Sequence, residues 1–321
     1  MQQATDGYTV RVLIDQWSDH HLSQRSASYR KHVPARMRRT LAKWLDAPAR
    51  SLTHADAVSV LDGVKSGSGL IAANRQRAEA RSCWGWALKR GTLTTNPWQA
   101  TPRPARENQR ERVLSDAELR ELWAASGALG EPWAAILRLL ILTGQRLGEV
   151  AGMAWSEIDL TAGLWTLPAN RTKNGRSHTV PLSAPALDIL RQVKRWRGAE
   201  LVFAGPRGTA PSGFGKVKLR LDAAMGDAAR AAEREMHPWT IHDIRRTVAT
   251  GLQRLGVRLE VTEAVLNHVS GSRSGIVGVY QRHGWDREKT EALSGWAGHV
   301  LACVEAPIIE GGSVAPLPLT A

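Results

Sequence analysis

A proline-containing stretch without hydrophobic periodicity divides this chain into two parts of different character. Residues 94–112 read TTNPWQATPRPARENQRER, with three prolines and many charged residues. Proline lacks a backbone N–H and fixes φ, so such a stretch does not continue a helix. At 321 residues the chain also exceeds the ~250 residues at which a single core usually stops growing. We therefore expect two domains, residues 1–105 and 115–305, joined by a linker at residues 106–114.

The part before this stretch carries only helical periodicity, and none of its segments alternates as a strand does. Ser26 and Thr53 stand where helix N-caps are expected. Apolar residues recur every three or four positions in residues 8–22, 26–33, 35–45, 53–64 and 69–91. These patterns predict an all-helical first domain.

The second part mixes helical and strand patterns. Ser115 and Glu118 have the spacing of a capping box, and an almost wholly apolar helix follows and stops at Gly144, as expected of a helix buried in its domain. Residues 156–183 hold short alternating runs, and Asn174-Gly175 within them suits a tight hairpin turn of a small antiparallel sheet. Helical patterns resume at residues 185–196, 242–256, 260–268 and 285–305. We expect a mainly α protein, with residues 306–321 as a disordered or partner-docking tail.

Composition excludes several classes of protein. No apolar run approaches the ~20 residues that span a bilayer, and the amino terminus lacks the pattern of a secretory signal. Two cysteines, Cys83 and Cys303, are too few for a disulfide framework or a four-thiolate zinc site, so we interpret both as packing residues. These features predict a soluble intracellular protein without a bound metal.

The net charge of +13 is concentrated in the first third of the chain. Residues 1–110 hold 18 of the 43 Lys and Arg residues but only 8 of the 30 Asp and Glu residues. Residues 25–43 contain seven cations and no acid, and a surface of one sign favours a polyanion because binding releases counterions from its phosphates. We expect nucleic acid as the partner. The candidate DNA-binding residues are Arg25, Arg30, Lys31, Arg36, Arg38, Arg39 and Lys43.

Cations, histidines and one tyrosine stand at the ends of otherwise apolar elements in the second domain. They are Arg146, Lys173, His242, Arg245, His268 and Tyr280. Spacing of three puts His242 and Arg245 on one helix face. Each residue alone has an ordinary structural explanation: Arg146 could pair with Glu149, Lys173 could be a solvated turn residue, and the histidines could sit at helix ends. Taken separately, none of them defines a site.

Taken together and in this order, these residues resemble the catalytic domain of the tyrosine recombinase, or phage integrase, family. The matching stretches lie between about residues 112 and 290 and read TGQRLGE, RTKNGRSHTVPL, HDIRRT, LNH and GVYQRH. The interval from His268 to Tyr280 is most similar to the P4-like branch. Residues 9–105 resemble the family's core-binding domain in helix pattern and charge. The resemblance implies the DNA breaking-rejoining enzyme fold, with a helical core-binding domain before a mostly helical catalytic domain.

The resemblance also implies a role for each residue. Tyr280 would be the nucleophile that forms a 3′-phosphotyrosyl bond, and Arg146 and Arg245 would bind the phosphate oxygens. Lys173 would protonate the departing 5′ oxygen, with Arg171 and Arg176 as the next cations to test. His242 and His268 would hydrogen-bond the phosphoryl group, and His242 could accept the tyrosine proton. Glu149 would orient Arg146.

The implied activity is site-specific recombination that integrates or excises a phage or genomic island, without metal, ATP or another cofactor. The implied partners are double-stranded DNA attachment sites, three further copies in a homotetramer on DNA, and an accessory directionality factor or host DNA-bending protein. No membrane partner is expected, and the expected location is the bacterial cytoplasm, in association with the nucleoid.

Two other functions fit the same residues. A type IB topoisomerase would use the same nucleophile and cations but religate the same strand, and a non-enzymatic DNA-binding protein would need only the basic surface. A metal nuclease is disfavoured because no clustered carboxylates accompany the histidines. The P4-like branch commonly carries an arm-binding domain, for which there is no room before residue 8, so either the protein works without arm sites or the chain is a fragment.

Overall fold

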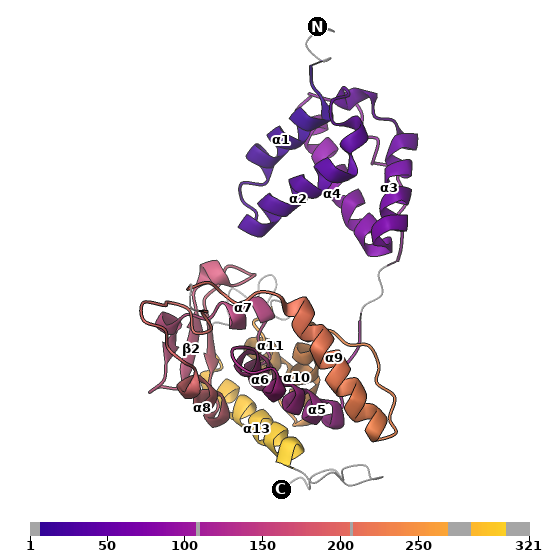
Figure 1. Cartoon of the computed structure of the whole chain (residues 1–321). Helices are drawn as coiled ribbons and strands as arrows, with labels where there is room; N and C mark the ends of the chain where they lie inside the picture. The colour runs from indigo at the N-terminus through magenta and orange to yellow at the C-terminus, as the bar shows by residue number, and fades with distance from the viewer. Residues whose placement is uncertain (1–6, 107–109, 206–207, 269–283, 306–321) are drawn as a thin grey trace. The chain divides into compact units, whose positions relative to one another are not determined.

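The computed structural model describes residues 7–106, 110–205, 208–268 and 284–305. They form two compact units divided between Arg110 and Glu111, each with its own hydrophobic core (Figure 1). The described residues are mainly helical with one small antiparallel sheet, so the predicted fold class is confirmed. Among these residues no helix is both long enough and apolar enough to cross a membrane.

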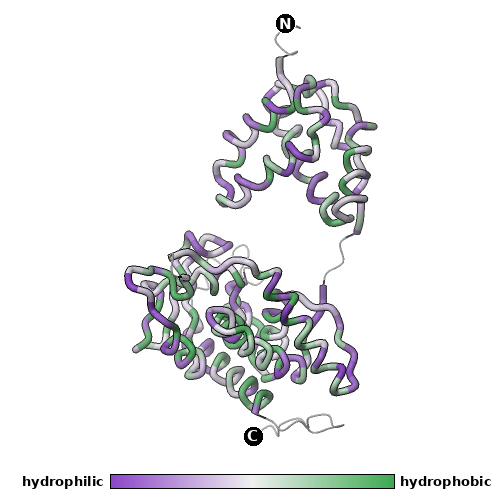
Figure 2. The backbone as a smooth tube through the Cα atoms, in the orientation of Figure 1, coloured by the Kyte–Doolittle hydropathy of each residue, from purple (hydrophilic) through white to green (hydrophobic). Residues whose placement is uncertain are grey.

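The first unit is a helical bundle closed around buried tryptophans. Figure 2 shows hydrophobic and hydrophilic residues alternating along its helices, and Trp17 and Trp84 lie fully within the core. The predicted N-caps form: the Ser26 hydroxyl accepts a hydrogen bond from the Tyr29 backbone N–H at 3.3 Å, and Thr53 forms a capping box with its helix. The helices are α1 Val10–His21, α2 Ala27–Thr40, α3 His54–Ser68 and α4 Leu70–Lys89, with short 3-10 turns at Ala42–Trp44 and Ala49–Ser51.

Two local features of this unit differ from the sequence patterns. The segments expected at residues 26–33 and 35–45 are joined: α2 continues through Pro34 to Thr40, and a 3-10 turn at Ala42–Trp44 follows. Proline removes one helical hydrogen bond, but Pro34 is buried with its neighbours against the core, and this packing keeps the helix continuous. The front of the proline-containing stretch also packs on this unit. Trp98 is fully buried, and the Asn74 side-chain amide exchanges hydrogen bonds with the Ala105 backbone at 2.9 and 3.2 Å.

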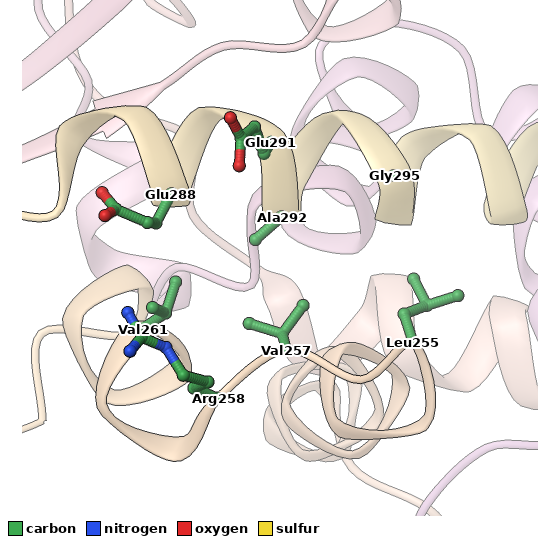
Figure 3. Close-up of a pocket in the computed structure, with 8 residues that line it drawn as sticks. All are labelled: Leu255, Val257, Arg258, Val261, Glu288, Glu291, Ala292 and Gly295. Carbon is green, nitrogen blue, oxygen red and sulfur yellow. The ribbon is translucent and has the colours of Figure 1, made fainter. Parts of the chain in front are cut away.

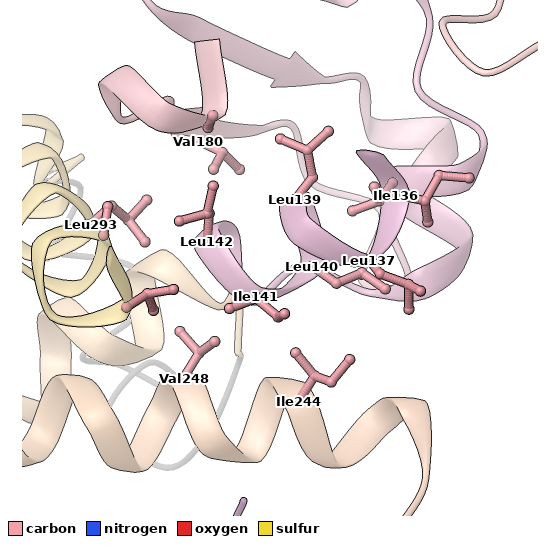
Figure 4. Close-up of a cluster of buried hydrophobic side chains, with 14 of the residues drawn as sticks. Ile136, Leu137, Leu139, Leu140, Ile141, Leu142, Val180, Ile244, Val248 and Leu293 are labelled. Carbon is pink, nitrogen blue, oxygen red and sulfur yellow. The ribbon is translucent and has the colours of Figure 1, made fainter. Parts of the chain in front are cut away.

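The second unit is built around α6, Trp133–Thr143, which contacts α5, α7, α8, α10 and α13. Every residue of α6 from Ala134 to Thr143 except Arg138 is buried, as the almost wholly apolar sequence predicts (Figure 4). Burying one leucine side chain contributes about 1.5–3 kcal/mol, so this helix supplies much of the domain's stability. The other helices are α5 Asp116–Ala128, α7 Leu147–Ala151, α8 Ala184–Gln192, α9 Phe214–Ala231, α10 Ile241–Arg254, α11 Leu259–Val265 and α13 Asp286–Glu305.

The sheet has three strands in sequence order, β1 Ile158–Asp159, β2 Leu164–Leu167 and β3 His178–Pro181, all paired antiparallel. Leu167 pairs with His178, so β2 and β3 are joined by residues 168–177 rather than by a two-residue hairpin turn at Asn174-Gly175. This loop includes a 3-10 turn, Ala169–Arg171, and a β-turn at Thr172–Gly175. The longer connection places Lys173 away from the strand ends.

Two further helices complete the core of the second unit. The α9 helix lies outside the predicted elements, although its buried residues Val217, Leu221 and Met225 follow a four-residue spacing. The α13 helix buries Leu293 and Trp296 against α5, α6, α10, α11 and β3 of its own unit. The apolar face of this helix therefore packs within the chain. The tail after Glu305 lies outside the described residues.

Candidate active site

Arg146 is held at the start of α7 by a buried carboxylate. Gly144 ends α6 with φ of 64°, and a Cβ there would lie 2.8 Å from a methyl of Val248, so only glycine fits this close turn. The chain then reaches Arg146, the N-cap of α7. The Glu149 carboxylate accepts from Arg146 Nη1 at 2.8 Å and from the Arg146 backbone N–H at 3.0 Å. This capping box fixes where the Arg146 side chain begins and how it points.

Arg245 lies on α10 and is almost fully buried. Its Nη1 donates to the Gly144 carbonyl at 2.9 Å and its Nη2 donates to the Leu266 carbonyl, whereas its Nε has no hydrogen-bond partner among the described residues. Burial, and then the Arg146 guanidinium, lowers the pKa of Arg245 to about 9, so the group remains charged at neutral pH. Two arginines whose charges repel each other in a partly desolvated site favour an anion between them.

The two candidate histidines face the same positive charges. Burial, followed by the guanidiniums of Arg246 and Arg245, lowers the pKa of His242. Burial, followed by those of Arg245 and Arg146, lowers the pKa of His268. Both shifts favour the neutral imidazole, which can donate one hydrogen bond and accept another. The structure thus brings His242, His268 and the two arginines into one electrostatic neighbourhood.

Lys173 is exposed in the β-turn of residues 172–175. The next residue ties this turn to the end of α11, because Asn174 Nδ2 donates to the Asn267 side-chain oxygen at 2.7 Å. Asn267, with φ of 49°, directly precedes His268. The loop at residues 168–177, here called the lysine loop, is therefore joined to residues 266–268, here called the histidine loop. The side-chain amides of Asn174 and Asn267 make this connection. Tyr280 lies outside the described residues.

Two residues absent from the predicted site hold the backbone before His268. Gln145 Nε2 donates to the Val265 carbonyl at 2.8 Å, and His178 Nε2 lies 3.1 Å from the same oxygen. Burial, then the charges of Lys289 and Arg245, lowers the pKa of His178 to about 4, so the ring is neutral and can donate through Nε2. In the sequence, Gln145 and His178 lie inside the motifs TGQRLGE and RTKNGRSHTVPL, and this position is the feature that could have identified them.

The other cations of the lysine loop differ from each other. Arg171 forms an ion pair with the buried Glu157 and donates to the Glu149 carbonyl at 2.9 Å, which fixes α7 to the loop. Arg176 is exposed. Arg171 is thus a structural cation here, and Arg176 resembles Lys173 in exposure.

The predicted basic run in the first unit is partly neutralised. Arg36 pairs with Glu79, and Arg38 pairs with Asp15. The remaining five cations of the run are exposed: Arg25, Arg30, Lys31, Arg39 and Lys43. These five are the residues best placed to contact a partner.

A pocket lies elsewhere in the described part of the second unit, between α13 and the connection from α10 to α11 (Figure 3). It has a volume of about 400 Å³ and is lined by residues that include Val257, Arg258 and Glu288. None of the candidate residues lines it. A phosphodiester is bound by cations at a surface rather than enclosed in a pocket, so we place the site at the arginines.

The sequence and the fold both match known recombination proteins. The model of the "Phage integrase family" matches residues 112–297. The chain is 31% identical over 170 residues to Prophage integrase IntA of Escherichia coli (strain K12), covering 53% of this chain and 39% of IntA. It is 28% identical over 199 residues to Tyrosine recombinase XerC of Xanthomonas campestris pv. campestris (strain B100), covering 60% of this chain and 59% of XerC. The chain thus spans about half the length of these relatives.

The fold is similar to that of a lambda integrase tetramer bound to a Holliday junction. The TM-score is 0.64 at 22% identity, over 84% of this chain and 80% of that chain. Because the family model covers more than half of the chain, and covers the arginines, the lysine loop and the histidines, this chain belongs to the phage integrase family of tyrosine recombinases.

Proposed function

We propose that the protein is a site-specific DNA recombinase that cleaves and rejoins double-stranded DNA through a 3′-phosphotyrosyl intermediate. The observation that carries the proposal is the buried Arg245, bonded to the Gly144 carbonyl two residues before Arg146, with burial and the same guanidiniums lowering the pKa of His242 and His268. Such a site can bind one phosphodiester and stabilise the extra charge of its transition state. The similarity to IntA and XerC supports the same activity, which would integrate or excise a phage or genomic island. The twelve-residue interval from His268 to Tyr280 supports a place in the P4-like branch.

The chemistry divides among the residues as follows. The phenolic oxygen of Tyr280 attacks phosphorus, its proton passes to His242, and the bond from phosphorus to the 5′ oxygen breaks. Lys173 gives a proton to that oxygen, and Arg146, Arg245 and His268 hold the phosphoryl oxygens. Attack by a 5′ hydroxyl on the phosphotyrosine reverses these steps and rejoins DNA. The phosphotyrosine conserves the bond energy, so ATP is not needed.

The neutral state of His242 suits the role of proton acceptor. A protonated histidine could not accept the tyrosine proton, and burial beside guanidiniums lowers the pKa of His242 and so favours its neutral form. The hydrogen bond between Asn174 and Asn267 supports a role for Lys173 and His268 at the same phosphodiester, because each amide is next to one of these two residues in the chain. Glu149 orients Arg146 and takes no part in proton transfer.

We propose that the first unit is the core-type DNA-binding domain and that its exposed cations contact DNA phosphates. The active assembly would be a homotetramer on two attachment sites, since the exchange of two duplexes requires four cleavages. The lambda integrase tetramer on a Holliday junction supports this stoichiometry for the fold. An accessory directionality factor or host DNA-bending protein would be a further partner.

Trapping of a covalent adduct on a suicide DNA substrate tests the proposal. Tyr280→Phe should retain DNA binding and form no adduct. Lys173→Ala should cleave poorly, and a substrate with a 5′-bridging sulfur should restore cleavage because the thiolate leaves without a proton. Arg176→Ala is the matched control, since it removes an exposed cation from the same loop and should cleave normally.

Three outcomes would count against these assignments. Adduct formation by Tyr280→Phe would exclude Tyr280 as the nucleophile. Failure of the sulfur substrate to rescue Lys173→Ala would move the acid role to another cation. Efficient relaxation of supercoiled plasmid without an attachment site would favour a topoisomerase.

A further inference from the structure

Three side chains with metal-binding atoms converge where the start of α5 meets the last turns of α13. Asp116 is the first residue of α5, and the Ser115–Glu118 capping box fixes its position. His299 and Cys303 are four residues apart, which places them on one face of α13. Their ligand atoms all lie within 4.8 Å of one another.

The contacts within this cluster meet at a single ring nitrogen. His299 Nε2 lies 3.2 Å from Asp116 Oδ1 and 3.5 Å from Cys303 Sγ. In a neutral imidazole this nitrogen either carries a hydrogen and donates it to the carboxylate, or carries a lone pair and accepts from the thiol. A single hydrogen or lone pair therefore makes at most one full-strength hydrogen bond at this nitrogen, whereas a cation shared by all three groups would bind each of them directly.

The distances fit a tetrahedral ion. Zinc lies about 2.0 Å from nitrogen and oxygen ligands and about 2.3 Å from sulfur, so neighbouring nitrogen and oxygen ligands are about 3.3 Å apart, and nitrogen and sulfur ligands about 3.5 Å. The two separations from His299 Nε2, 3.2 and 3.5 Å, agree with these values, and the carboxylate and thiol atoms lie within 4.8 Å of each other, so a small movement of either side chain would complete the geometry. A thiolate, an imidazole and a carboxylate together are a donor set typical of zinc rather than of magnesium or calcium.

We propose that Asp116, His299 and Cys303 bind one Zn²⁺ ion, with water as the fourth ligand. Binding forms three bonds from the protein to the metal and releases the thiol proton of Cys303 to solvent. The side chains of Asp116 and His299 are 22% and 15% exposed, which leaves one side open to water and to the entering ion. The ion joins the end of α13 to the start of α5.

Two arginines near this cluster, Arg254 and Arg120, would repel a cation. Arg254 can move into solvent, and Arg120 is already bonded to the backbone. Arg254 Nη1 forms an ion pair with Asp116 Oδ1 at 3.4 Å, a distance that is long for a hydrogen bond, and the Arg254 side chain is 60% exposed and can turn into solvent. Arg120 donates through Nε to the Cys303 carbonyl at 2.6 Å and so is held by the backbone. The carboxylate and the thiolate together balance the charge of the ion.

Cobalt absorption on the full, tag-free chain tests this site. After treatment with a chelator, one equivalent of Co²⁺ should produce a thiolate-to-cobalt charge-transfer band with the visible spectrum of four-coordinate cobalt, and Zn²⁺ should remove it. Cys303→Ser and His299→Gln should each abolish the band. Cys83→Ala should keep it, because Cys83 is fully buried in the core of the first unit.

Thermal unfolding supplies the second measurement. Zn²⁺ should raise the unfolding midpoint of the wild-type chain and of Cys83→Ala, and leave that of Cys303→Ser and His299→Gln unchanged. Absence of a charge-transfer band in the folded wild-type chain would overturn the proposal. So would a band that survives Cys303→Ser, or an equal Zn²⁺ shift in all four proteins.

Discussion

Replacing Glu149 by Gln removes one charge from the contact that orients Arg146. The carboxylate now accepts two hydrogen bonds, from the guanidinium at 2.8 Å and from the Arg146 backbone N–H at 3.0 Å. Glutamine offers one carbonyl oxygen and one amino group, so one of the two donors would face another donor. The side chain of Glu149 is only 6% exposed, so water cannot replace the lost acceptor.

The expected cost follows from these two contacts. A hydrogen bond to a charged group is worth about 1.5–3 kcal/mol, and loss of a helix cap costs about 0.5–2 kcal/mol. We expect the free energy of unfolding to fall by about 2–4 kcal/mol. If mispositioned Arg146 loses about half of a 3 kcal/mol contribution to the transition state, adduct formation slows about tenfold.

Glu118 provides a matched control within the same domain. It too is a buried capping-box carboxylate that accepts from the N-cap backbone N–H, of Ser115 at 2.8 Å, and pairs with an arginine, Arg112. Burial would raise the pKa of Glu118, but the hydrogen bonds from Arg112 and Ser115 outweigh it and lower the pKa. Glu118→Gln should therefore cost a similar amount of stability at pH 7 and leave the rate of adduct formation unchanged.

Urea denaturation gives the two stabilities, and the suicide substrate gives the two rates at a temperature where both variants are folded. A slower rate in Glu149→Gln alone supports the positioning of Arg146. Equal slowing in both variants, or a wild-type rate in Glu149→Gln, would refute it. Because a lowered carboxyl pKa stabilises the fold above the unfolded pKa, the deficit of Glu118→Gln should also shrink below about pH 4.

Three further predictions concern pH, packing and charge. The pKa of His178 is about 4 in the fold and 6.5 in the unfolded chain, so the free energy of unfolding should fall by about 3 kcal/mol as the pH falls from 6.5 to 4. Urea denaturation at several pH values should show that His178→Gln lacks this pH-dependent loss of stability. Gly251→Ala places a Cβ 2.1 Å from a buried tryptophan of α13 and should cost about 1–3 kcal/mol or more in thermal unfolding, whereas Gly295→Ala meets no atom within 4 Å and should be neutral or slightly stabilising. If the first unit binds DNA, Arg39→Ala should reduce the salt dependence of binding by about one unit of slope, and Arg36→Ala by less, because Arg36 is paired with an acid.

The sequence determined the features that depend on neighbours along the chain. A capping box needs only a hydroxyl and a carboxylate three residues apart, and Ser115 and Glu118 form it as predicted. The helix ending at Gly144 and the terminal helix from Asp286 also follow from local spacing, because helical contacts join residues three and four apart. The order of the motifs predicted the family, because each short motif is specific only in combination with the others.

Which groups meet in space depends on the packing of elements that are distant in the sequence. The Val265 carbonyl accepts from Gln145, which lies 120 positions away in the chain, and also lies beside His178. Asp116 and His299 are separated by 183 positions, and no local pattern signals their contact. Likewise, α2 continues through Pro34 because the surrounding core outweighs the lost hydrogen bond. Such contacts depend on how several helices pack at once, which the periodicity of any single segment does not encode.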